Sequence, residues 1–186
     1  MNNLLQTAKS AAHVAGDIIL SYYHSEYEVK MKGKGNPVTE ADIAADHKLK
    51  ELLTSAYPNY GWLSEETRDS AHRLEKERVW VVDPIDGTKE FVEGVPNFVV
   101  SIGLVENGMP ILGVIHNPVT KDTYSAFSGE GTKFNGKDVS ISTISELSQM
   151  EMLNSRSETK KGLWEPYHSY FKQLIPIGSI DLKLAM

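Results

Sequence analysis

The residues best suited to chemistry are carboxylates at the ends of strand-forming runs. In VWVVDPIDGTKEF, a strand delivers Asp83 to its end, and the proline and glycine that follow turn the chain, so that Asp83 and Asp86 can converge. Two close carboxylates repel each other, which raises the pKa of one unless a cation neutralises both. Mg²⁺ prefers oxygen ligands, and the carbonyl of Ile85 between the aspartates is a further candidate ligand. The segment therefore predicts a Mg²⁺ site.

The next residues predict an anion site beside this metal. Gly87 lets the backbone approach an anion, and the N–H groups of Gly87 and Thr88 point outward if a short helix begins there. The Thr88 hydroxyl could orient a water molecule for attack on phosphorus, provided that a carboxylate accepts its proton. The pattern favours phosphate chemistry.

Each of these features also has a simpler interpretation. An isolated Asp-Pro-x-Asp-Gly is often a turn in which the aspartates bond to their own backbone. Paired glutamates such as Glu65 and Glu66 often lie in a solvated loop, and Asp42 on its own is a helix-capping residue. Together, however, Asp42, Glu65, Asp83 and Asp86 would form an acidic cluster that is too costly to leave without cations. Their joint occurrence favours the metal site.

Two amphipathic helices are expected ahead of these strands. Residues 3–24 carry apolar side chains at a spacing of three to four, and residues 39–57 begin with Thr39 and Asp42 in the arrangement of a capping box. Residues 27–38 between them are predicted to be extended or looped, since their glycines and proline interrupt helical continuity.

From residue 60 onward the sequence favours strands. Short runs rich in Val, Ile, Tyr and Phe are separated by Asn-Gly, Asn-Pro and Ser-Gly turns, which predicts a mostly antiparallel sheet. The expected strands lie within residues 60–66, 79–83, 97–108, 109–118, 122–129 and 129–142. Residues 150–155 predict a further strand, and residues 158–174 predict a helix despite Pro166.

This order of elements predicts an α+β to α/β fold class with two domains. The first domain (1–145) would bind metal and phosphate on its mostly antiparallel sheet, and a second α/β domain would begin at residues 146–186 and be incomplete.

Composition excludes several classes of function. The net charge of −6 and the absence of a basic, aromatic-rich cluster argue against a nucleic-acid partner. No apolar run is long enough for a membrane span and no leader peptide is recognisable, so we expect a cytoplasmic protein with no membrane partner. Because the sequence contains no cysteine, thiol-based phosphatase chemistry is absent.

Three segments resemble, in order and spacing, the signatures of the inositol monophosphatase superfamily. They are GNPVTEADIAAD, WLSEET and the long run that begins WVVDPIDGTKEF and ends GVIHNPV. The resemblance extends over essentially the whole chain. It implies the layered sheet-and-helix sandwich of that family and a lithium-sensitive, Mg²⁺-dependent phosphatase.

The resemblance also implies roles for individual residues. Two or three Mg²⁺ ions would be bound by Glu65, Asp83, Asp86 and the carbonyl of Ile85. The catalytic residues would be Asp42, Thr88 and Glu65, with Asp42 and Thr88 activating a water molecule that attacks phosphorus without a phosphoenzyme. A small phosphorylated substrate would contact Gly87, Thr88 and Asp86. A haloacid-dehalogenase-type phosphatase would instead need Asp-x-Asp, whereas the interval here is Asp-x-x-Asp.

Two branches of the superfamily are candidates. Lys89-Glu90-Phe91 and the Ser-Arg-Ser that begins at Ser155 resemble 3'(2'),5'-bisphosphate nucleotidases, which act on 3'-phosphoadenosine 5'-phosphate. That branch usually has a histidine where Glu158 stands. Residues 94–108 and 178–186 are closer to inositol-1-monophosphatases. The sequence favours the nucleotidase, and it predicts that Ser155, Arg156 and Ser179 are ordinary loop residues.

One departure from the family leaves a second class of function open. The family continues after GSIDLKLAM with a Trp-Asp motif that supplies another metal ligand, but the sequence ends at Met186 and contains no Trp-Asp pair. We therefore expect either a fragment or a degenerate relative, and a catalytically silent metal- or phosphate-binding protein is the alternative to an enzyme. Apolar faces of the incomplete second domain would favour aggregation or pairing, so a homodimer also stays open.

Overall fold

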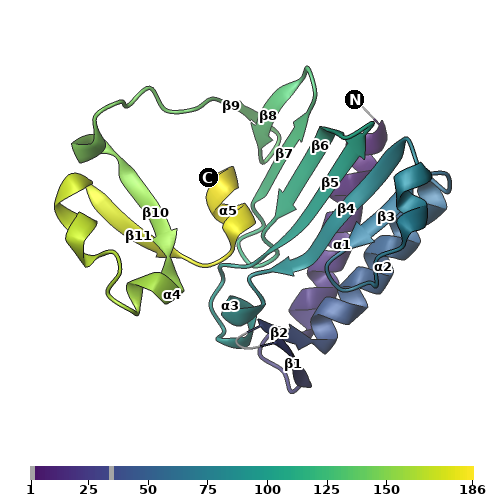
Figure 1. Ribbon diagram of the computed structural model, residues 1–186, viewed down its shortest axis with the longest axis horizontal. Helices are drawn as coiled ribbons and strands as arrows, with labels where there is room; N and C mark the ends of the chain where they lie inside the picture. Colours follow the sequence, from purple (N-terminus) through teal and green to yellow (C-terminus); the bar gives the residue numbers. More distant parts are fainter. Residues whose placement is uncertain (1–2, 34–35) are drawn as a thin grey trace.

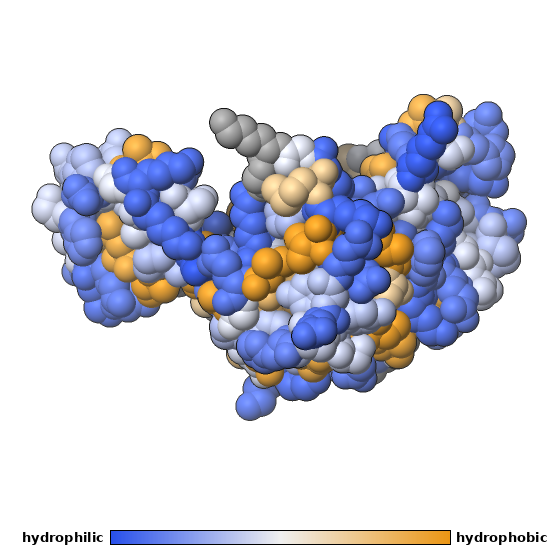
Figure 2. Space-filling view, turned by 90° about the horizontal axis from the view of Figure 1, so that it is seen from below, coloured by the Kyte–Doolittle hydropathy of each residue, from blue (hydrophilic) through white to orange (hydrophobic). Residues whose placement is uncertain are grey.

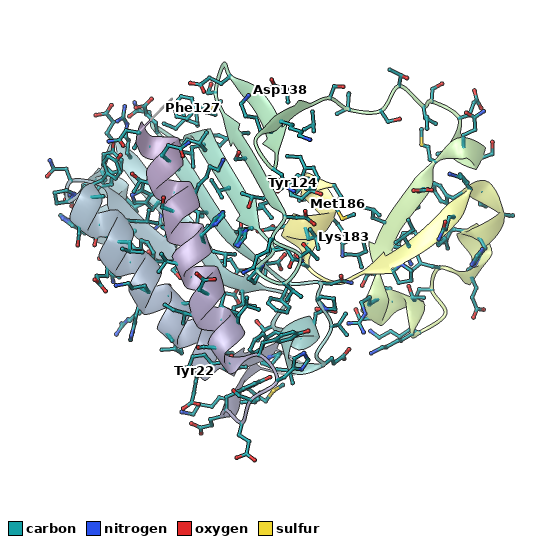
Figure 3. All side chains as sticks on the ribbon, turned by 180° about the vertical axis from the view of Figure 1, so that it is seen from behind. Tyr22, Tyr124, Phe127, Asp138, Lys183 and Met186 are labelled. Carbon is teal, nitrogen blue, oxygen red and sulfur yellow. The ribbon has the colours of Figure 1, made fainter. Side chains whose placement is uncertain are left out.

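Two long helices cover one face of a large sheet, and a smaller lobe stands beside this sheet (Figure 1). The computed structural model describes residues 3–33 and 36–186. Helix α1 (Asn3–Tyr22) packs against β5 and β6, and α2 (Glu40–Ala56) packs against β4. Figure 3 shows the same two helices from behind, lying across the strands. The expected layered α+β architecture is confirmed.

Both predicted helices are confirmed, together with the start of the second. The buried face of α1 consists mainly of alanines, with Leu5 and Ile19 near its two ends. Thr39 caps α2, because its side chain accepts from the N–H of Asp42 while the carboxylate of Asp42 accepts from the N–H of Thr39 at 2.8 Å. This reciprocal pair satisfies two N–H groups that a helix start would otherwise leave without partners.

The segment between the two helices is a hairpin. Strand β1 (Val29–Gly33) pairs antiparallel with β2 (Asn36–Thr39), in agreement with the expected extended or looped conformation. That prediction also included residues 34–35, which lie outside the described residues.

Within the described residues, seven strands form the main sheet in sequential order. They are β3 (Gly61–Ser64), β4 (Arg78–Asp86), β5 (Val99–Glu106), β6 (Met109–His116), β7 (Thr123–Phe127), β8 (Gly131–Phe134) and β9 (Lys137–Val139). All neighbours are antiparallel except β3 and β4. The connection between these two is long enough for a parallel crossover and contains a 3₁₀ helix (Ala71–Glu75). The side chains of Trp80, Phe98 and Leu104 are fully buried beneath the helices.

Strand β4 does not end at Asp83 as the sequence predicted. Pairing with β5 continues to Asp86, and the register shifts between Asp83 and Asp86. This irregularity accommodates Pro84, which has no N–H to donate to a ladder. The short helix α3 (Thr88–Val92) follows at once, as expected.

The second lobe (residues 151–186) combines a parallel pair of strands with short helices. It contains β10 (Glu151–Ser155), α4 (Arg156–Thr159), a 3₁₀ helix (Glu165–Tyr170), β11 (Gln173–Ile177) and α5 (Ile180–Ala185). Another 3₁₀ helix (Leu147–Gln149) precedes it. The strand expected at 150–155 is confirmed. Figure 2 shows the lobe projecting from the main body of the molecule.

The helix predicted over residues 158–174 is wrong. Helix α4 ends at Thr159, and Gly162 follows with a φ of 73°, a left-handed conformation that ends a helix. Pro166 then lies at the start of the 3₁₀ helix, where its missing N–H costs no bond. Across the described part of the chain, no helix is both long and apolar enough to cross a membrane.

A buried histidine on β6 makes the stability of the fold dependent on pH. His116 is 1% exposed, its Nδ1 lies 2.9 Å from Oγ1 of Thr123, and its ring stacks on His13 with centroids 4.3 Å apart. Burial, and then the neighbouring His13, lower the pKa of His116 from 6.5 to about 4. Lys121 also lowers this pKa, whereas the backbone of Asp122 and the carboxylate of Asp17 oppose the shift.

We expect His116 to contribute up to about 3 kcal/mol of stability that is present above pH 6.5 and lost as pH falls toward 4. The unfolded chain binds the proton more readily over this range, which favours unfolding. Urea unfolding at several pH values should show this loss in the wild type, and His116→Gln should remove that part of the pH dependence. The same change at exposed His72 is the control. Parallel stability curves for wild type and His116→Gln would contradict the prediction.

Candidate active site

The site lies where the main sheet meets the second lobe. A cavity of about 370 Å³ opens between them. Its first wall contains the predicted residues Glu65, Asp83, Ile85, Asp86, Gly87 and Thr88. Its second wall contains Ser155, Arg156, Gly178, Ser179 and Lys183 from the lobe. All the predicted site residues except Asp42 therefore line this one cavity. Asp42 contacts the site through its hydrogen bond with Thr88.

The parallel pairing of β3 and β4 places Glu65 beside Asp83. Ser64 is in register with Val82, and the N–H of Glu65 donates to the carbonyl of Val82 at 3.2 Å. The two carboxyl groups share a hydrogen bond. Burial, and then the charges of Glu65 and Asp86, raise the pKa of Asp83 to about 9. This carboxyl pair therefore holds a proton at neutral pH.

A lysine from the β1–β2 hairpin also reaches the acidic residues. The ammonium of Lys32 lies 2.7 Å from Oε1 of Glu65 and 2.7 Å from Oε1 of Glu66. Burial opposes charge on Glu65, but the bond from Lys32 lowers its pKa overall. Burial raises the pKa of Glu66 despite the same lysine. One ammonium thus partly neutralises this side of the cluster.

Asp86 connects the first wall to the second lobe. Its Oδ2 accepts hydrogen bonds from the hydroxyl of Ser179 and, at 2.7 Å, from the N–H of Asp181. Burial raises the pKa of Asp86, although both of these bonds favour its charged form. Neither of these two hydrogen bonds involves the other carboxylate oxygen of Asp86, Oδ1.

Asp42 and Thr88 form the predicted pair. The hydroxyl of Thr88 lies 3.0 Å from Oδ1 of Asp42 and 3.1 Å from the carbonyl oxygen of Ile85, so its one proton has two acceptors within reach. Oδ2 of Asp42 accepts from the N–H of Thr39 and, at 2.5 Å, from its hydroxyl. Burial raises the pKa of Asp42 against these hydrogen bonds. Asp42 thus caps α2 and also contacts the site.

Gly87 is required by the path of the backbone at the start of α3. Its φ is 105°, and a Cβ there would lie 2.9 Å from the carbonyl oxygen of Asn97 and 3.1 Å from Cα of Phe98. Any other residue would be strained as well as crowded. The first N–H groups of α3 have no partners within the helix, and the residues Gly87, Thr88 and Lys89 at its start line the cavity.

The donor set fits a divalent cation in its chemistry. Glu65, Asp83 and Asp86 line one cavity and offer carboxylate oxygens, and burial, followed by the charges of Glu65 and Asp86, raises the pKa of Asp83 to about 9. In residues 3–33 and 36–186, no three acidic or histidine side chains form a ready metal cage. Glu65 is hydrogen-bonded to Lys32, and Asp86 is hydrogen-bonded to Asp181 of the second lobe. Binding an ion would therefore require these side chains to rearrange.

Several site residues were missed by sequence reasoning. Lys32 carries no local pattern that would indicate its partners. Asp46 is buried and accepts hydrogen bonds from the hydroxyls of Ser64 and Thr67, which fixes the loop containing Glu65 to α2. Its position four residues after Asp42, on the same helix face, was a usable signal. Asp181, whose charge also raises the pKa of Asp83, carries no sequence pattern that would have indicated this contact.

Three residues predicted to be ordinary loop residues have structural roles at the cavity. Ser155 caps α4, and Ser179 caps α5 while it bonds to Asp86. Arg156 forms ion pairs with two glutamates on or next to α3. The prediction that these are ordinary loop residues is therefore wrong.

The chain is similar to proteins of one family. A family model described as the inositol monophosphatase family matches residues 1–186. Inositol monophosphatase 1 from Solanum lycopersicum is 36% identical over 149 residues, which is 79% of this chain and 55% of that protein. The structure of extragenic suppressor protein suhB from Bartonella henselae superposes with a TM-score of 0.88 at 27% identity, over 99% of this chain and 74% of that one.

A further solved structure, of SaIMPase-II with 2'AMP bound, has a TM-score of 0.79 at 26% identity, over 98% of this chain and 69% of that one. The chain spans a little over half the length of the first curated relatives it matches.

Proposed function

The chain belongs to the inositol monophosphatase family, and on this basis we propose that it hydrolyses phosphomonoesters with the help of Mg²⁺. The observation that carries the proposal is the cavity, in which Glu65, Asp83 and Asp86 meet the start of α3 and the Asp42–Thr88 pair. A catalytically silent binding protein is less well supported, because such a protein has no need of a hydroxyl–carboxylate pair beside the acidic cluster.

The residues that would hold Mg²⁺ are Glu65, Asp83, Asp86 and the carbonyl of Ile85. When bound, Mg²⁺ supplies positive charge that stabilises the oxygens of the reacting phosphate. The N–H groups of Gly87 and Thr88 would bind phosphate oxygens beside it. This arrangement accounts for a glycine at a position where other residues would clash.

The Asp42–Thr88 pair would position the nucleophile. The Thr88 hydroxyl accepts a hydrogen bond from water while it donates its own proton to Oδ1 of Asp42, so the water lone pair is directed at phosphorus. The new bond joins the water oxygen to phosphorus, and the ester bond to the alcohol oxygen breaks. The attacking water gives up one proton through the Thr88 hydroxyl to Oδ1 of Asp42, and the leaving alkoxide takes up a proton from solvent. Asp42 then releases its proton to solvent, so no phosphoenzyme is needed.

Inositol 1-phosphate is the first candidate substrate. Curated relatives that cover most of this chain are named inositol monophosphatases, and these names support a cyclitol phosphate. The sequence favoured a bisphosphate nucleotide because of Lys89-Glu90-Phe91 and Ser-Arg-Ser, but the guanidinium of Arg156 is engaged by Glu90 and Glu93. This reverses the order in which we rank the two substrates.

A nucleotide bisphosphate is the second candidate. Lys89 and Lys183 line the cavity in addition to the acidic cluster, and a second phosphate would be a suitable partner for such ammonium groups. Figure 3 shows Lys183 between the main sheet and the second lobe. A structural relative has been solved with 2'AMP bound, and this supports a nucleotide phosphate as the second candidate.

Phosphate release from three substrates tests the proposal. We expect Mg²⁺-dependent turnover that EDTA abolishes and Li⁺ inhibits, with inositol 1-phosphate hydrolysed faster than 3'-phosphoadenosine 5'-phosphate and fructose 1,6-bisphosphate. A preference for the nucleotide would favour the second candidate. If none of the substrates is hydrolysed while Mg²⁺ still binds, the chain is the silent binding protein.

We also propose that residues 1–145 and 146–186 belong to two domains. The support is the change from the large sheet to a separate pair of strands, across a connection with no regular secondary structure at residues 140–146.

A further inference from the structure

We propose that Arg156 is a positioning residue that fixes the second lobe to α3 and thereby holds the phosphate-binding end of α3 in place. The inference rests on the proposed function, because it assigns α3 to phosphate binding. This role differs from one in which the arginine would itself contact the substrate.

Two ion pairs connect Arg156 to the α3 segment. Its Nη1 lies 2.9 Å from Oε1 of Glu90, and its Nη2 lies 2.9 Å from Oε2 of Glu93. The side chains of Arg156 and Glu90 are only 19% and 12% exposed, so water screens this pair weakly. Lys160 also reaches Glu93, but at 3.3 Å and with a side chain that is 64% exposed. The Arg156–Glu90 pair is therefore the main contact.

Glu90 is also confined on its other side. A Cβ added to Gly178 would lie 2.1 Å from Cδ and 2.2 Å from Cγ of Glu90. The Glu90 side chain thus occupies the space that a side chain at position 178 would need. The backbone of the second lobe and the guanidinium of Arg156 together hold Glu90 in one orientation.

This contact acts on the part of α3 that faces the cavity. Glu90 is two residues after Thr88, within a helix of only five residues. A short helix has little cooperativity of its own and is oriented by its tertiary contacts. Asp86, just before α3, is bonded to Ser179 and Asp181 of the same lobe. The start of α3 is therefore held from both sides by the second lobe.

Arg156→Met and Glu90→Gln distinguish positioning from direct binding of substrate. If Arg156 positions α3, both variants should weaken the binding of inorganic phosphate in the presence of Mg²⁺ by about tenfold and raise KM for inositol 1-phosphate similarly. If Arg156 is a substrate ligand, Glu90→Gln should release the guanidinium and tighten binding. The two variants then change affinity in opposite directions, and this result would overturn the proposal.

Gly178→Ala tests the same contact by steric means. The added methyl group should displace Glu90 and reproduce the loss seen in Glu90→Gln, with no change of charge. Lys160→Met, which removes only the exposed partner of Glu93, is the matched control and should stay within about twofold of the wild type. Wild-type phosphate affinity in Gly178→Ala would contradict the role of Glu90.

Failure of the proposed function has a separate readout. Amide hydrogen exchange of Phe91, whose N–H donates to the carbonyl of Gly87 at 3.0 Å, needs no substrate, and it should accelerate in Arg156→Met and Glu90→Gln but not in Lys160→Met. If the wild type lacks phosphatase activity while exchange changes in this pattern, the positioning role stands and the catalytic proposal fails. Unchanged exchange in both Arg156→Met and Glu90→Gln would reject the positioning role.

Discussion

Replacing Asp83 by asparagine should weaken Mg²⁺ binding by at least about a hundredfold, while it stabilises the metal-free protein. Even groups in the second coordination shell change metal affinity by about 10- to 100-fold, and Asp83 is placed to be a direct ligand. In the metal-free protein the same carboxyl lowers the stability of the fold at pH 7, because burial and the charges of Glu65 and Asp86 raise its pKa to about 9. The two effects of one substitution therefore have opposite signs.

The direction of the stability change follows from proton binding. An acid with a raised pKa in the folded state favours folding below its unfolded pKa, and this contribution is lost as pH rises from about 4 toward 9. At pH 7 the folded protein must keep a proton that the unfolded chain releases. Asparagine removes this requirement, so the free energy of unfolding in EDTA should rise by a few kcal/mol at pH 7.

Calorimetry and urea unfolding measure the two halves of this prediction. Binding of Mg²⁺ to the wild type at pH 7 should also release about one proton, which titration in two buffers of different ionisation enthalpy detects. Asp69→Asn is the control, since this carboxylate pairs with Arg73 at the surface, away from the cavity. Unchanged Mg²⁺ affinity in Asp83→Asn would reject the proposed ligand set, and a less stable metal-free variant would reject the argument from repulsion.

Local signals in the sequence were sufficient for the two long helices and most of the strands. Thr39 and Asp42 predicted the start of α2 because a capping box involves side chains and backbone groups only three residues apart. The antiparallel strands were predictable for a similar reason, since short turns connect neighbours such as β5 and β6. In each case the decisive interactions lie close together in the chain.

Features that depend on distant contacts were not predictable in this way. The parallel pairing of β3 with β4 depends on a long crossover that carries no turn signal. The second lobe was predicted to contain a long helix despite Pro166, but Gly162, which was not considered, adopts a left-handed conformation that ends the helix. Local propensity was overridden there by backbone geometry.

The residues of the candidate site also fall into those predictable from local sequence and those that depend on distant contacts. Asp83, Asp86 and Thr88 lie within six residues of each other, so their convergence followed from one turn and one helix start. Lys32 and Ser179 approach the same cluster from the hairpin and from the second lobe, at sequence distances for which no pairwise pattern exists. The sequence therefore predicted the acidic groups but missed the groups that balance them.

Removal of the Thr88 hydroxyl should slow turnover by about 10²- to 10⁴-fold, the usual contribution of a positioned acid–base group. In Thr88→Val the water molecule loses its hydrogen-bond partner, and Oδ1 of Asp42 loses a donor at 3.0 Å. KM and Mg²⁺ affinity should change little, because the hydroxyl is not among the proposed metal ligands. Thr88→Ser keeps the hydroxyl and should retain most of the wild-type rate.

A double-mutant cycle with Asp42→Asn tests whether the two residues act as one unit. Asparagine keeps the shape of the side chain but accepts a proton far less readily, so kcat should fall to a similar degree in this variant. If Thr88 acts only by passing its proton to Asp42, the double variant should be about as slow as the slower single variant, since groups that act together are not additive.

The capping role of Asp42 has to be separated from its catalytic role in this cycle. Oδ2 accepts from Thr39 at the start of α2, so Asp42→Asn should also cost about 1 kcal/mol of stability, a loss that Thr88→Val does not share. Thermal unfolding of each variant measures that loss independently of kcat. Fully additive effects on kcat would show that Thr88 and Asp42 contribute separately, and the water molecule would then need a different base.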